Sequence, residues 1–284
     1  MGVSRPGVSR LLQKAREQGI VKIEIIDPHM QGAILENGLK EKFGLKSAVV
    51  IPNNDDDDKT IKSRLAIAAV KFLNHIIQDG TVLGVSWGTS LQAVSLALPK
   101  KKFREMTVVQ LNGGISRAEY DTHASEIVRR FGERLSAIPF MLPLPAVVDR
   151  AELKQTITSD KNIARTLTLA EKATVALFTI GSFDHHSALV KADYFDSTEV
   201  DRLLQKGAVG DICSRIISRD GSISSTELNE RTLGISLKAL QEKPWSVAIA
   251  GGREKLEAIR AALAGNYFNT LITDELVAKE LIEN

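Results

Sequence analysis

The sequence predicts an α/β fold built on a parallel β-sheet that helices cover on both faces. From residue 81 onward, short apolar runs without polar alternation are separated by segments in which apolar residues recur at helical spacing. Strands that lack a polar face are buried on both sides, and their alternation with helices is typical of doubly wound sheets. Several of these runs end at glycine, which suits loops that approach a ligand closely.

Length and composition are those of a globular protein. The chain has 284 residues, 43% hydrophobic and 25% charged, so we expect one large domain with an appendage, or two domains. The net charge of +2 leaves any affinity for nucleic acid to a local patch. The single cysteine, Cys213, excludes an internal disulfide and is expected to be buried and inert. Without a signal core, or an apolar run of the roughly 18 residues that a membrane span needs, we expect a cytoplasmic protein.

The periodicity places helices and strands in alternating order. The acidic segment 53–59 is expected to be an exposed loop before a helix, where its acids favour the positive end of the helix dipole. Helices are expected at 31–43, 60–78, 121–136 and 253–264 and from about Thr89 and Glu275, and strands at 47–51, 81–85, 107–111, 175–180, 245–250 and 270–272.

The N-terminal segment is basic. Residues 2–18 have the spacing of an amphipathic helix that ends at Gly19, and a short strand is expected at 20–26. Val8, Leu11, Leu12 and Ala15 mark the face expected to be buried. The excess of basic over acidic residues fits a solvated helix, but small polar and arginine side chains at a helix start also suit reading of the DNA major groove. The candidates for DNA contact are Ser4, Arg5, Ser9, Arg10 and Lys14.

The strand expected at 81–85 leads into a candidate anion site. Open parallel sheets bind ligands at the carboxyl ends of their strands. Here a glycine allows close backbone approach, hydroxyls are available, and a helix start offers free N–H groups, which together suit a phosphate. A plain helix cap is the structural alternative, and the tryptophan either stacks on a ligand or walls the pocket. The residues are Ser86, Trp87, Gly88, Thr89 and Ser90.

Other expected strands also end at glycines with polar neighbours. Asp211 could accept hydrogen bonds from sugar hydroxyls, and Lys255 could reach a phosphate from the first turn of a helix. Tight turns at these glycines are the alternative. The residues that follow these strands are Asn112, Gly113, Gly114, Gly181, Ser182, Gly210, Gly251 and Gly252.

Two groups that contain histidine are weaker candidates. Asp184, His185 and His186 lack a second ligand cluster, and adjacent histidines rarely converge on one ion, so we expect no metal and no other cofactor. His123 and Glu126 could form an acid–base pair at i and i+3, although a solvated helix face explains them as well. The sequence places no histidine beside the phosphate loop, where Asp211 is the only acid that we can assign.

Over nearly the whole chain these motifs resemble the SorC-type bacterial regulators, and among them the deoxyribonucleoside regulators of Bacillus type. The first two matching segments look like a recognition helix and its wing, and the third looks like the family's phosphate loop. The segments are SRPGVSRLL (4–12), GIVKI (19–23), GVSWGTS (84–90), QLNGG (110–114), LPLPA (142–146), GAVGDI (207–212), AGG (250–252) with Lys255, and LITD (271–274).

The resemblance implies a Rossmann-like, doubly wound sheet, similar to sugar-phosphate isomerases, in a homodimer or homotetramer that binds operator DNA. It divides the chain into a partial helix-turn-helix at 1–26 and an effector domain at 27–284. The effector would be a small phosphorylated sugar. Its phosphate would lie on Gly88, Thr89 and Ser90, its sugar near Gln110, Asn112, Gly113 and Asp211, with Lys255 as a cationic contact and Ser86, Trp87 and Gly114 completing the site.

Two departures from the family pattern bear on function. Family members begin with further helices before the recognition helix, whereas about three residues precede it here, which indicates a shortened chain, a misassigned start or a loss of DNA binding. Some members carry a cationic residue where Asn112 stands. A lysine there could form an imine with an open-chain aldehyde and asparagine cannot, so we expect the effector to bind non-covalently.

Three functions are therefore compared. The leading hypothesis is a transcription regulator of a sugar or nucleoside catabolism operon, whose DNA binding is controlled by the sugar phosphate. The alternative is an enzyme similar to sugar-phosphate isomerases or deaminases, because a fold does not decide a function. A third hypothesis is a sensor that does not bind DNA itself and acts by hetero-oligomerising with intact relatives.

Overall fold

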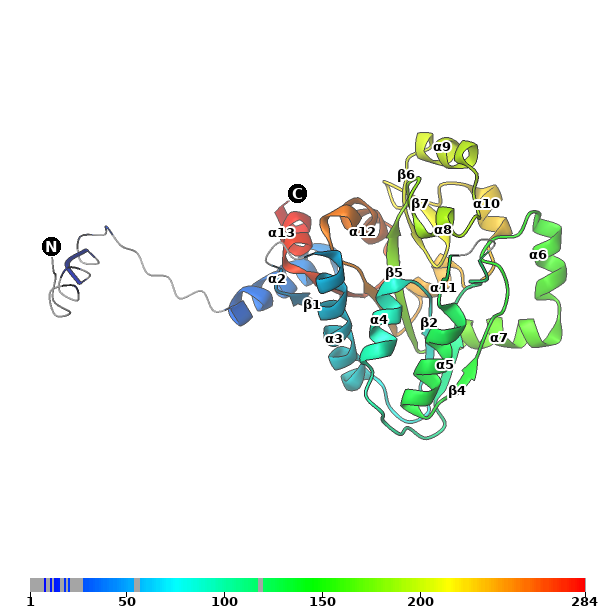
Figure 1. The fold of residues 1–284 in the computed structure, drawn as a ribbon, viewed down its shortest axis with the longest axis horizontal. Coiled ribbons are helices and arrows are strands. Elements are labelled where there is room, and N and C mark those ends of the chain that lie inside the picture. Colours follow the sequence, from blue (N-terminus) through cyan, green and yellow to red (C-terminus); the bar gives the residue numbers. More distant parts are fainter. Residues whose placement is uncertain are drawn as a thin grey trace.

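The structure is a computed structural model of the chain, and it describes residues 8, 11, 13–15, 18, 20, 28–53, 57–116 and 120–283. Within these residues, a parallel sheet has helices on both sides (Figure 1). Its strands lie in the order β1, β9, β8, β5, β2, β3, β4, and neighbours in this order pair in parallel. They are β1 (Ser47–Ile51), β2 (Val82–Val85), β3 (Thr107–Gln110), β4 (Ile138–Phe140), β5 (Val175–Ser182), β8 (Trp245–Ile249) and β9 (Thr270–Asp274).

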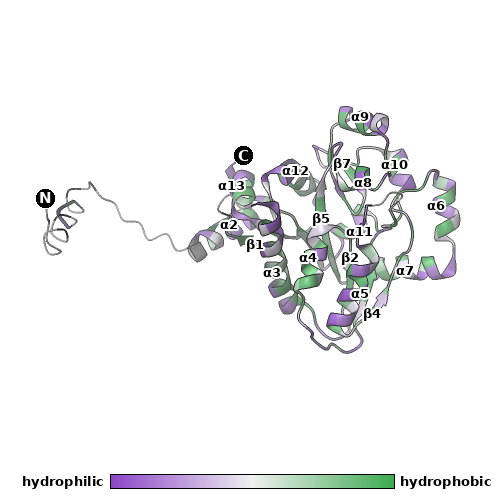
Figure 2. Ribbon diagram, in the orientation of Figure 1, coloured by the Kyte–Doolittle hydropathy of each residue, from purple (hydrophilic) through white to green (hydrophobic). Residues whose placement is uncertain are grey.

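Helices connect the strands and cover the sheet. Most have the amphipathic pattern that buries one side and exposes the other, and Figure 2 shows hydrophilic residues on their outer sides. The helices are α2 (Pro28–Phe43), α3 (Asp58–Ile76), α4 (Thr89–Ala97), α5 (Ala124–Leu135), α6 (Ala151–Thr158), α7 (Lys161–Lys172), α8 (Ala188–Lys191), α9 (Ser197–Gln205), α10 (Thr226–Arg231), α11 (Leu237–Gln241), the 3-10 helix η1 (Arg253–Lys255), α12 (Leu256–Ala264) and α13 (Glu275–Glu283).

Side chains alternate between the two faces of the sheet and enter two buried clusters. On one face, Leu177 of β5 belongs to the same cluster as Leu65 of α3 and Phe131 of α5. On the other face, the next residue, Phe178, shares a cluster with Leu39 of α2. The described residues thus form a sandwich of helices, sheet and helices, which confirms the predicted doubly wound α/β fold.

The order of the strands fixes where a ligand can bind. From β2 the chain proceeds outward through β3 and β4 on one side, and then returns to the other side of β2 with β5, β8 and β9. Neighbouring connections therefore leave β2 and β5 in opposite directions, which opens a crevice at their carboxyl ends. The functional site should lie at this switch point.

An antiparallel arm extends the sheet beside the switch point. Residues 175–179 of β5 pair in parallel with β8, whereas 180–182 pair antiparallel with β6 (Ala208–Ile212), which in turn pairs with β7 (Arg215–Ser218). Gly181 and Gly210 therefore lie inside strands, and our expectation that they follow strand ends is wrong. Periodicity did not reveal the arm because the turn between its two added strands, Cys213–Ser214, lacks the asparagine or glycine that usually marks a tight hairpin turn.

Close backbone contact explains the glycines of this arm. A β-carbon on Gly181 would lie 2.2 Å from Oδ1 of Asp211, and one on Gly210 would lie 2.7 Å from the Gly181 carbonyl oxygen. Larger residues at either position would push β5 and β6 apart and move Asp211.

The other expected elements differ from the structure mainly at their ends. The helix expected at 121–136 begins at Ala124, and the one expected at 253–264 begins as η1 before continuing as α12. The acidic loop before α3 supplies its N-cap, because Oδ1 of Asp57 accepts a hydrogen bond from the Thr60 N–H at 2.7 Å. The strand β4 and the helices α6 to α11 were not predicted. The helices α8, α10 and α11 have four to six residues, too few for a period to be detected, whereas α7, with 12 residues, was overlooked.

The N-terminal predictions fall mostly outside the described residues. Ser4, Arg5, Ser9, Arg10 and all but the first residue of the strand expected at 20–26 lie there. Residues 8, 11 and 13–15 are helical as expected, and Lys14 is exposed. Val8 and Leu11 are 44% and 62% exposed, so the expectation of a buried face is wrong for these two side chains, because no described part of the chain covers them.

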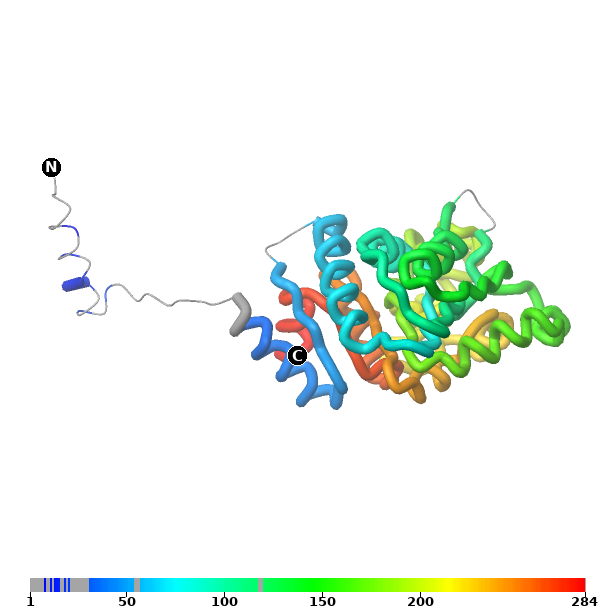
Figure 3. Tube along the Cα trace, turned by 90° about the horizontal axis from the view of Figure 1, so that it is seen from below, coloured from blue at the N-terminus to red at the C-terminus, as the bar shows by residue number. Residues whose placement is uncertain are grey.

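The first and last helices of the range 28–283 pack against each other. Figure 3 shows α2 (blue) beside α13 (red), and the Lys42 ammonium donates a hydrogen bond to the Ile282 carbonyl at 2.9 Å. A β-carbon on Gly38 of α2 would lie 2.9 Å from Cδ1 of Ile282, so the glycine permits this close packing. None of the helices in the described ranges combines the length and apolar character that crossing a bilayer requires.

The substitution Gly181→Ala should lower the free energy of unfolding by about 1–3 kcal/mol, because the added methyl group overlaps Asp211 across the β5–β6 pair. Urea denaturation of the purified chain measures the change. The control is Gly32→Ala in α2, where the new β-carbon meets only the Val50 carbonyl oxygen at 3.7 Å. That variant should keep or gain stability, and equal stability of the two variants would contradict the role of the close contact.

Candidate ligand-binding site

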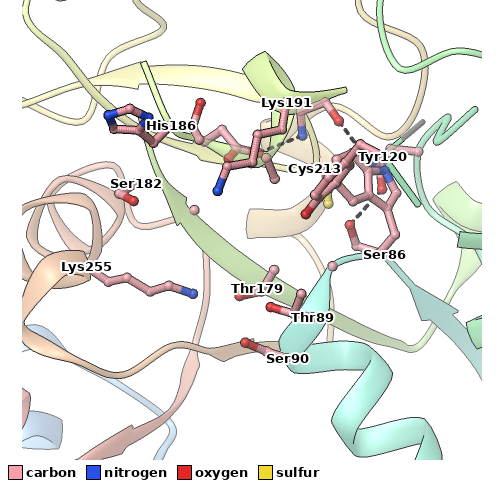
Figure 4. Close-up of a pocket in the computed structure, with 18 of the residues that line it drawn as sticks. Ser86, Thr89, Ser90, Tyr120, Thr179, Ser182, His186, Lys191, Cys213 and Lys255 are labelled. Carbon is pink, nitrogen blue, oxygen red and sulfur yellow. Dashed lines mark hydrogen bonds between the residues drawn. The ribbon is translucent and has the colours of Figure 1, made fainter. Parts of the chain in front are cut away.

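A cavity of about 230 Å³ lies at the predicted switch point, against the ends of β2 and β5 (Figure 4). Its walls come from the β2–α4 loop, the antiparallel arm, α8 and the segment that leads into α12. Eight of the eleven expected effector-binding residues line it: Ser86, Trp87, Gly88, Thr89, Ser90, Asn112, Asp211 and Lys255. The other three, Gln110, Gly113 and Gly114, do not line it.

The β2–α4 loop forms the wall with the features of an anion site. Gly88 precedes α4 with φ 120°, a conformation that side chains disfavour, and the glycine makes no side-chain cap. The N–H groups in the first turn of any α-helix have no partner within the helix, and here no side chain caps them. In α4 they point along the helix axis toward its N-terminus, which lies at the cavity. The hydroxyl-bearing residues Thr89 and Ser90 lie on the same turn (Figure 4).

Trp87 is fixed as a wall of the cavity. Its indole is buried, and Nε1 donates a hydrogen bond to the Gly113 carbonyl oxygen at 2.8 Å. Gly113 and Gly114 make this packing possible, because a β-carbon on Gly114 would lie 3.0 Å from the indole and one on Gly113 would lie 2.1 Å from the Pro145 carbonyl oxygen. The two glycines thus support the site from behind.

Asn112 joins three segments through its side-chain amide. Its Oδ1 accepts a hydrogen bond from the Ser86 hydroxyl at 2.7 Å, and its Nδ2 donates to Oγ of Ser214 at 2.8 Å. The Ser214 N–H donates to Oδ2 of Asp211 at 3.2 Å. We refer to Ser86, Asn112, Ser214 and Asp211 as the polar chain, and it connects the ends of β2 and β3 to the arm.

Gln110 has a supporting place behind the polar chain. Its side chain is 1% exposed, and Nε2 donates to the Asn112 carbonyl oxygen at 2.8 Å. Its Oε1 accepts from the Leu142 N–H at 3.0 Å. Both ends of the amide are therefore occupied by the backbone, which leaves Gln110 to hold Asn112 in place.

The β6–β7 turn brings two more residues to the cavity. Cys213 and Ser214 connect paired strands with φ 49° and 68°, as in the tight hairpin turns that need positive φ at both central residues. Such turns favour asparagine and glycine, so this one is held by its surroundings. As expected, Cys213 is buried; burial raises the pKa of its thiol to about 12 and keeps it protonated at neutral pH.

Asp211 and Lys255 carry opposite charges into the same cavity. Burial raises the pKa of the Asp211 carboxyl to about 6, against the lowering effects of the Ser214 N–H and of Lys255. Burial also lowers the pKa of the Lys255 ammonium, and nearby Lys62 adds to this, whereas Asp58, Glu254 and Asp211 oppose it. An anionic group of a ligand beside Lys255, and hydrogen-bond donors of the ligand beside Asp211, would favour the charged form of each side chain.

Asp274 holds the segment that carries Lys255. It is fully buried at the end of β9, and its Oδ2 accepts a hydrogen bond from the Gly252 N–H at 2.6 Å. Its Oδ1 accepts from Nδ2 of Asn53 at 2.8 Å and from the Val277 N–H at the start of α13 at 3.2 Å. The Asp274 carboxylate therefore fixes the loop that follows β8, and it also accepts a hydrogen bond from the first turn of α13.

Several residues of the cavity were missed. His186 lines the cavity on the side away from Thr89 and Ser90 (Figure 4), and Glu254 adds a second acid to Asp211. His186 was missed because it lies on the segment between β5 and β6, beyond the strand end that was inspected, whereas Glu254 is next to Lys255 and was passed over. A search continued for ten residues past 180 would have reached part of this set. Gly181 and Ser182, which the sequence did single out, also line the cavity. The lining residues that were not predicted are Lys62, Tyr120, Thr179, His186, Ser187, Ala188, Lys191, Cys213, Ser214 and Glu254.

The remaining histidine candidates lie apart from this chemistry. Nδ1 of His123 is 3.0 Å from Oδ2 of Asp121 and 3.7 Å from Oε2 of Glu126, and none of the three lines the cavity. Nε2 of His185 lies 3.0 Å from Oδ1 of Asp201 at the surface. Across the part of the chain that the structure describes, no three His, Cys, Asp or Glu side chains gather as metal ligands would.

The family follows from comparison with known proteins. The sequence model of a family described as "Putative sugar-binding domain" matches residues 28–283, which span the sheet and the cavity. The chain belongs to this family. The deoxyribonucleoside regulator of Bacillus subtilis (strain 168) is 38% identical over 284 residues, covering 100% of this chain and 90% of that protein. The resemblance to SorC-type regulators is confirmed.

Solved structures of the family share the fold. The full-length sorbitol operon regulator SorC from Klebsiella pneumoniae is 31% identical, with a TM-score of 0.81 over 98% of this chain and 90% of that one. A domain of a possible sugar-binding transcriptional regulator from Arthrobacter aurescens TC1 is 30% identical, with a TM-score of 0.83 over 92% of this chain and 100% of that one. The family's named members are transcription regulators of sugar or nucleoside operons.

The raised pKa of Asp211 predicts a pH dependence of stability. In the unfolded chain the carboxyl titrates near its ordinary value, so between about pH 4 and 6 the native state binds more protons than the unfolded state. The wild type should therefore lose roughly 1–3 kcal/mol relative to Asp211→Asn as the pH rises from 4 to 7. Urea denaturation of both proteins across this range measures the difference, and a constant difference would contradict the raised pKa.

Proposed function

We propose that the cavity binds a small phosphorylated sugar non-covalently and that its occupancy controls binding to operator DNA. The observation that carries this proposal is the convergence of three phosphate-binding features at the switch point. They are the free N–H groups at the start of α4, the hydroxyl-bearing residues Thr89 and Ser90, and the ammonium of Lys255. The effector-binding roles assigned to the expected residues belong to this proposal.

Polar groups around the phosphate end suit a sugar. Asp211 offers a carboxylate to hydroxyl groups, and the side chains of Thr179 and Ser182 offer hydroxyls on the same wall. Asn112 supports non-covalent binding, because its amide has no nucleophilic nitrogen and both of its ends are already hydrogen-bonded within the polar chain.

The regulatory half of the proposal rests on the relatives. The names of two relatives describe a deoxyribonucleoside regulator and a sorbitol operon regulator, which supports a role for this chain in controlling a catabolic operon. We propose residues 1–26 as the DNA-binding segment and 27–284 as the effector domain of a cytoplasmic homodimer or homotetramer. Of the proposed DNA contacts, Lys14 is the one within the described residues, and it is exposed.

Phosphate recognition is tested by calorimetric titration of the purified chain with a panel of sugar phosphates. Lys255→Met should weaken the best ligand about 10- to 100-fold, the expected cost of losing a charge-assisted hydrogen bond in a partly buried site. The matched control is Lys100→Met, which removes an exposed lysine from a loop outside the cavity. Equal affinities of the two variants, or no binding of any sugar phosphate to the wild type, would count against the phosphate site.

Regulation is tested by fluorescence anisotropy on labelled DNA from the region upstream of the protein's own gene. We expect the full chain to bind this DNA and the ligand found by titration to change the affinity by at least about fivefold, as typical allosteric coupling does. Binding that no ligand alters would overturn the regulatory half of the proposal. Binding that needs a co-expressed full-length relative would instead favour the hetero-oligomeric sensor.

An enzyme on the same fold is the second candidate, and one observation favours it. A carboxyl group whose pKa is about 6 can both accept and donate a proton near neutral pH, and His186 lines the same cavity as Asp211. The names of the relatives favour regulation instead. Turnover of ribose 5-phosphate or glucosamine 6-phosphate by the purified protein, lost in Asp211→Asn, would establish the enzyme.

A further inference from the structure

A buried arginine lies behind the cavity, on the antiparallel arm. Arg215 is the first residue of β7 and directly follows the turn at Cys213 and Ser214, whose φ angles are positive. Arg215 is 4% exposed and does not line the cavity. Burial lowers the pKa of its guanidinium to about 10, which leaves the group charged at neutral pH, and no described carboxylate forms an ion pair with it. A buried charge of this kind is costly unless hydrogen bonds satisfy it.

Oxygen atoms of one separate segment satisfy the guanidinium. Its Nε donates a hydrogen bond to the Ile235 carbonyl oxygen at 2.7 Å, and Nη2 donates to the Gly234 carbonyl oxygen at 3.0 Å. Nη1 donates to the carbonyl oxygen of Asn229 at 3.1 Å and also to Oδ1 of that residue, in the last turn of α10. One planar group therefore holds the segment 229–235 against the arm.

The segment that Arg215 holds lies directly against Asn112. Gly234 and Asn112 form an antiparallel bridge, and beside it the Ile235 N–H donates to the Leu111 carbonyl oxygen at 2.8 Å. A β-carbon on Gly234 would lie 2.6 Å from Cα of Asn112, so the two backbones are in close contact. The position of the Asn112 backbone therefore depends on where Arg215 holds Gly234.

These contacts close a ring around Asn112. The Asn112 amide donates to Oγ of Ser214 at 2.8 Å, Arg215 is the next residue along the chain, and its guanidinium returns through Gly234 to the Asn112 backbone. The Ser214 N–H, which lies in the ring, donates to Oδ2 of Asp211 at 3.2 Å. Loss of the guanidinium would therefore release the turn and the Asn112 backbone together.

We propose that Arg215 is a positioning residue of the ligand site, which holds Asn112 and the Ser214 N–H in the places that the ligand requires and does not touch the ligand itself. The effect on ligand affinity rests on the proposed function, because the sugar is expected beside Asn112 and Asp211. The free N–H groups at the start of α4 lie outside the ring, so the phosphate end of the ligand does not depend on Arg215.

The geometry of the guanidinium also separates positioning from charge. A lysine in place of Arg215 keeps the positive charge, but its ammonium is a single point and cannot reach the oxygens of Asn229, Gly234 and Ile235 together. Arg215→Lys therefore tests the hydrogen bonds, and Arg215→Met tests the hydrogen bonds and the charge. Asn229→Ala is a milder third variant, since it removes one side-chain acceptor of the guanidinium and leaves the others.

The first measurement is calorimetric titration of the full chain with the best ligand of the sugar-phosphate panel and, separately, with inorganic phosphate. Arg215→Lys and Arg215→Met should each weaken the sugar phosphate about tenfold, because a loosened wall must be ordered again when the ligand binds. The affinity for inorganic phosphate should stay within about twofold of the wild type. Asn229→Ala should change the two affinities in the same pattern by a smaller factor.

Lys243→Met is the matched control. Lys243 is 5% exposed, its ammonium donates to the carbonyl oxygens of Ala170, at 3.1 Å, and Glu171, and it does not line the cavity. Like Arg215→Met, this variant removes a buried cation that holds backbone oxygens. It should lower the temperature of thermal unfolding and leave the affinity for the sugar phosphate unchanged.

The second measurement needs no ligand. The pKa of the Asp211 carboxyl is raised to about 6 by burial, while the Ser214 N–H and Lys255 lower it. A displaced Ser214 N–H would favour the carboxylate less, so the pKa of Asp211 should rise further in both Arg215→Lys and Arg215→Met. Titration of the Asp211 carboxyl carbon by NMR, assigned with Asp211→Asn, measures this pKa, and Lys243→Met should leave it unchanged.

The outcomes separate the two proposals. Wild-type affinity and a wild-type pKa of Asp211 in Arg215→Lys would overturn the inference, as would equal weakening of the sugar phosphate and inorganic phosphate. A weaker sugar phosphate in Lys243→Met would also overturn it, because general destabilisation would then explain the loss. If no sugar phosphate binds the wild type, the proposed function fails, and the titration of Asp211 still decides whether Arg215 positions the polar chain.

Discussion

The site depends on a short series of buried hydrogen bonds that passes through the amide of Asn112. This polar chain ties the end of β2, the end of β3 and the β6–β7 turn to one another, with Gln110 holding Asn112 from behind. In a low-dielectric interior such bonds are strong when each member is satisfied and costly when one is removed. The strained turn at Cys213 and Ser214 and the position of Asp211 both follow from this series.

A second group of hydrogen bonds, made by Asp274, holds the side of the cavity that carries Lys255. The buried carboxylate of Asp274 accepts hydrogen bonds from Gly252, Asn53 and the start of α13, so the loop that carries Lys255 has little freedom. The acid and the ammonium that face the cavity are therefore positioned by different parts of the sheet. Burial disfavours the charged form of each group, and a charged and hydroxylated ligand would offset this cost.

The sequence predicted the wall built from the β2–α4 loop because that wall obeys simple rules. Strand ends, glycines and helix starts are visible as local patterns, and Gly88, Thr89 and Ser90 occupy all three. The same rules misassigned Gly113 and Gly114, whose lack of side chains serves packing against Trp87 and Pro145. A glycine signals close approach by some atom, and only the fold decides whether that atom belongs to a ligand or to the protein.

The opposite wall could not be predicted in the same way. Lys191 ends a four-residue helix with no detectable period and Ser187 directly precedes that helix, and their place in the cavity depends on the change of β5 from parallel to antiparallel pairing. That change is a property of tertiary contacts among β5, β6 and α12, where Gly210 lies against Ala258. Likewise, the pKa of Asp211 depends on burial by segments distant in sequence.

The antiparallel arm has a consequence for how such a protein can change. It joins the sheet only at the last three residues of β5, so the seven parallel strands do not depend on its side chains for their own pairing. Substitutions on the arm and on the segment that follows it can alter the shape and charge of one wall while the frame beneath stays intact. A single scaffold can in this way be adapted to new metabolites through the few side chains of the arm that face the cavity, while the rest of the arm stays buried in the core.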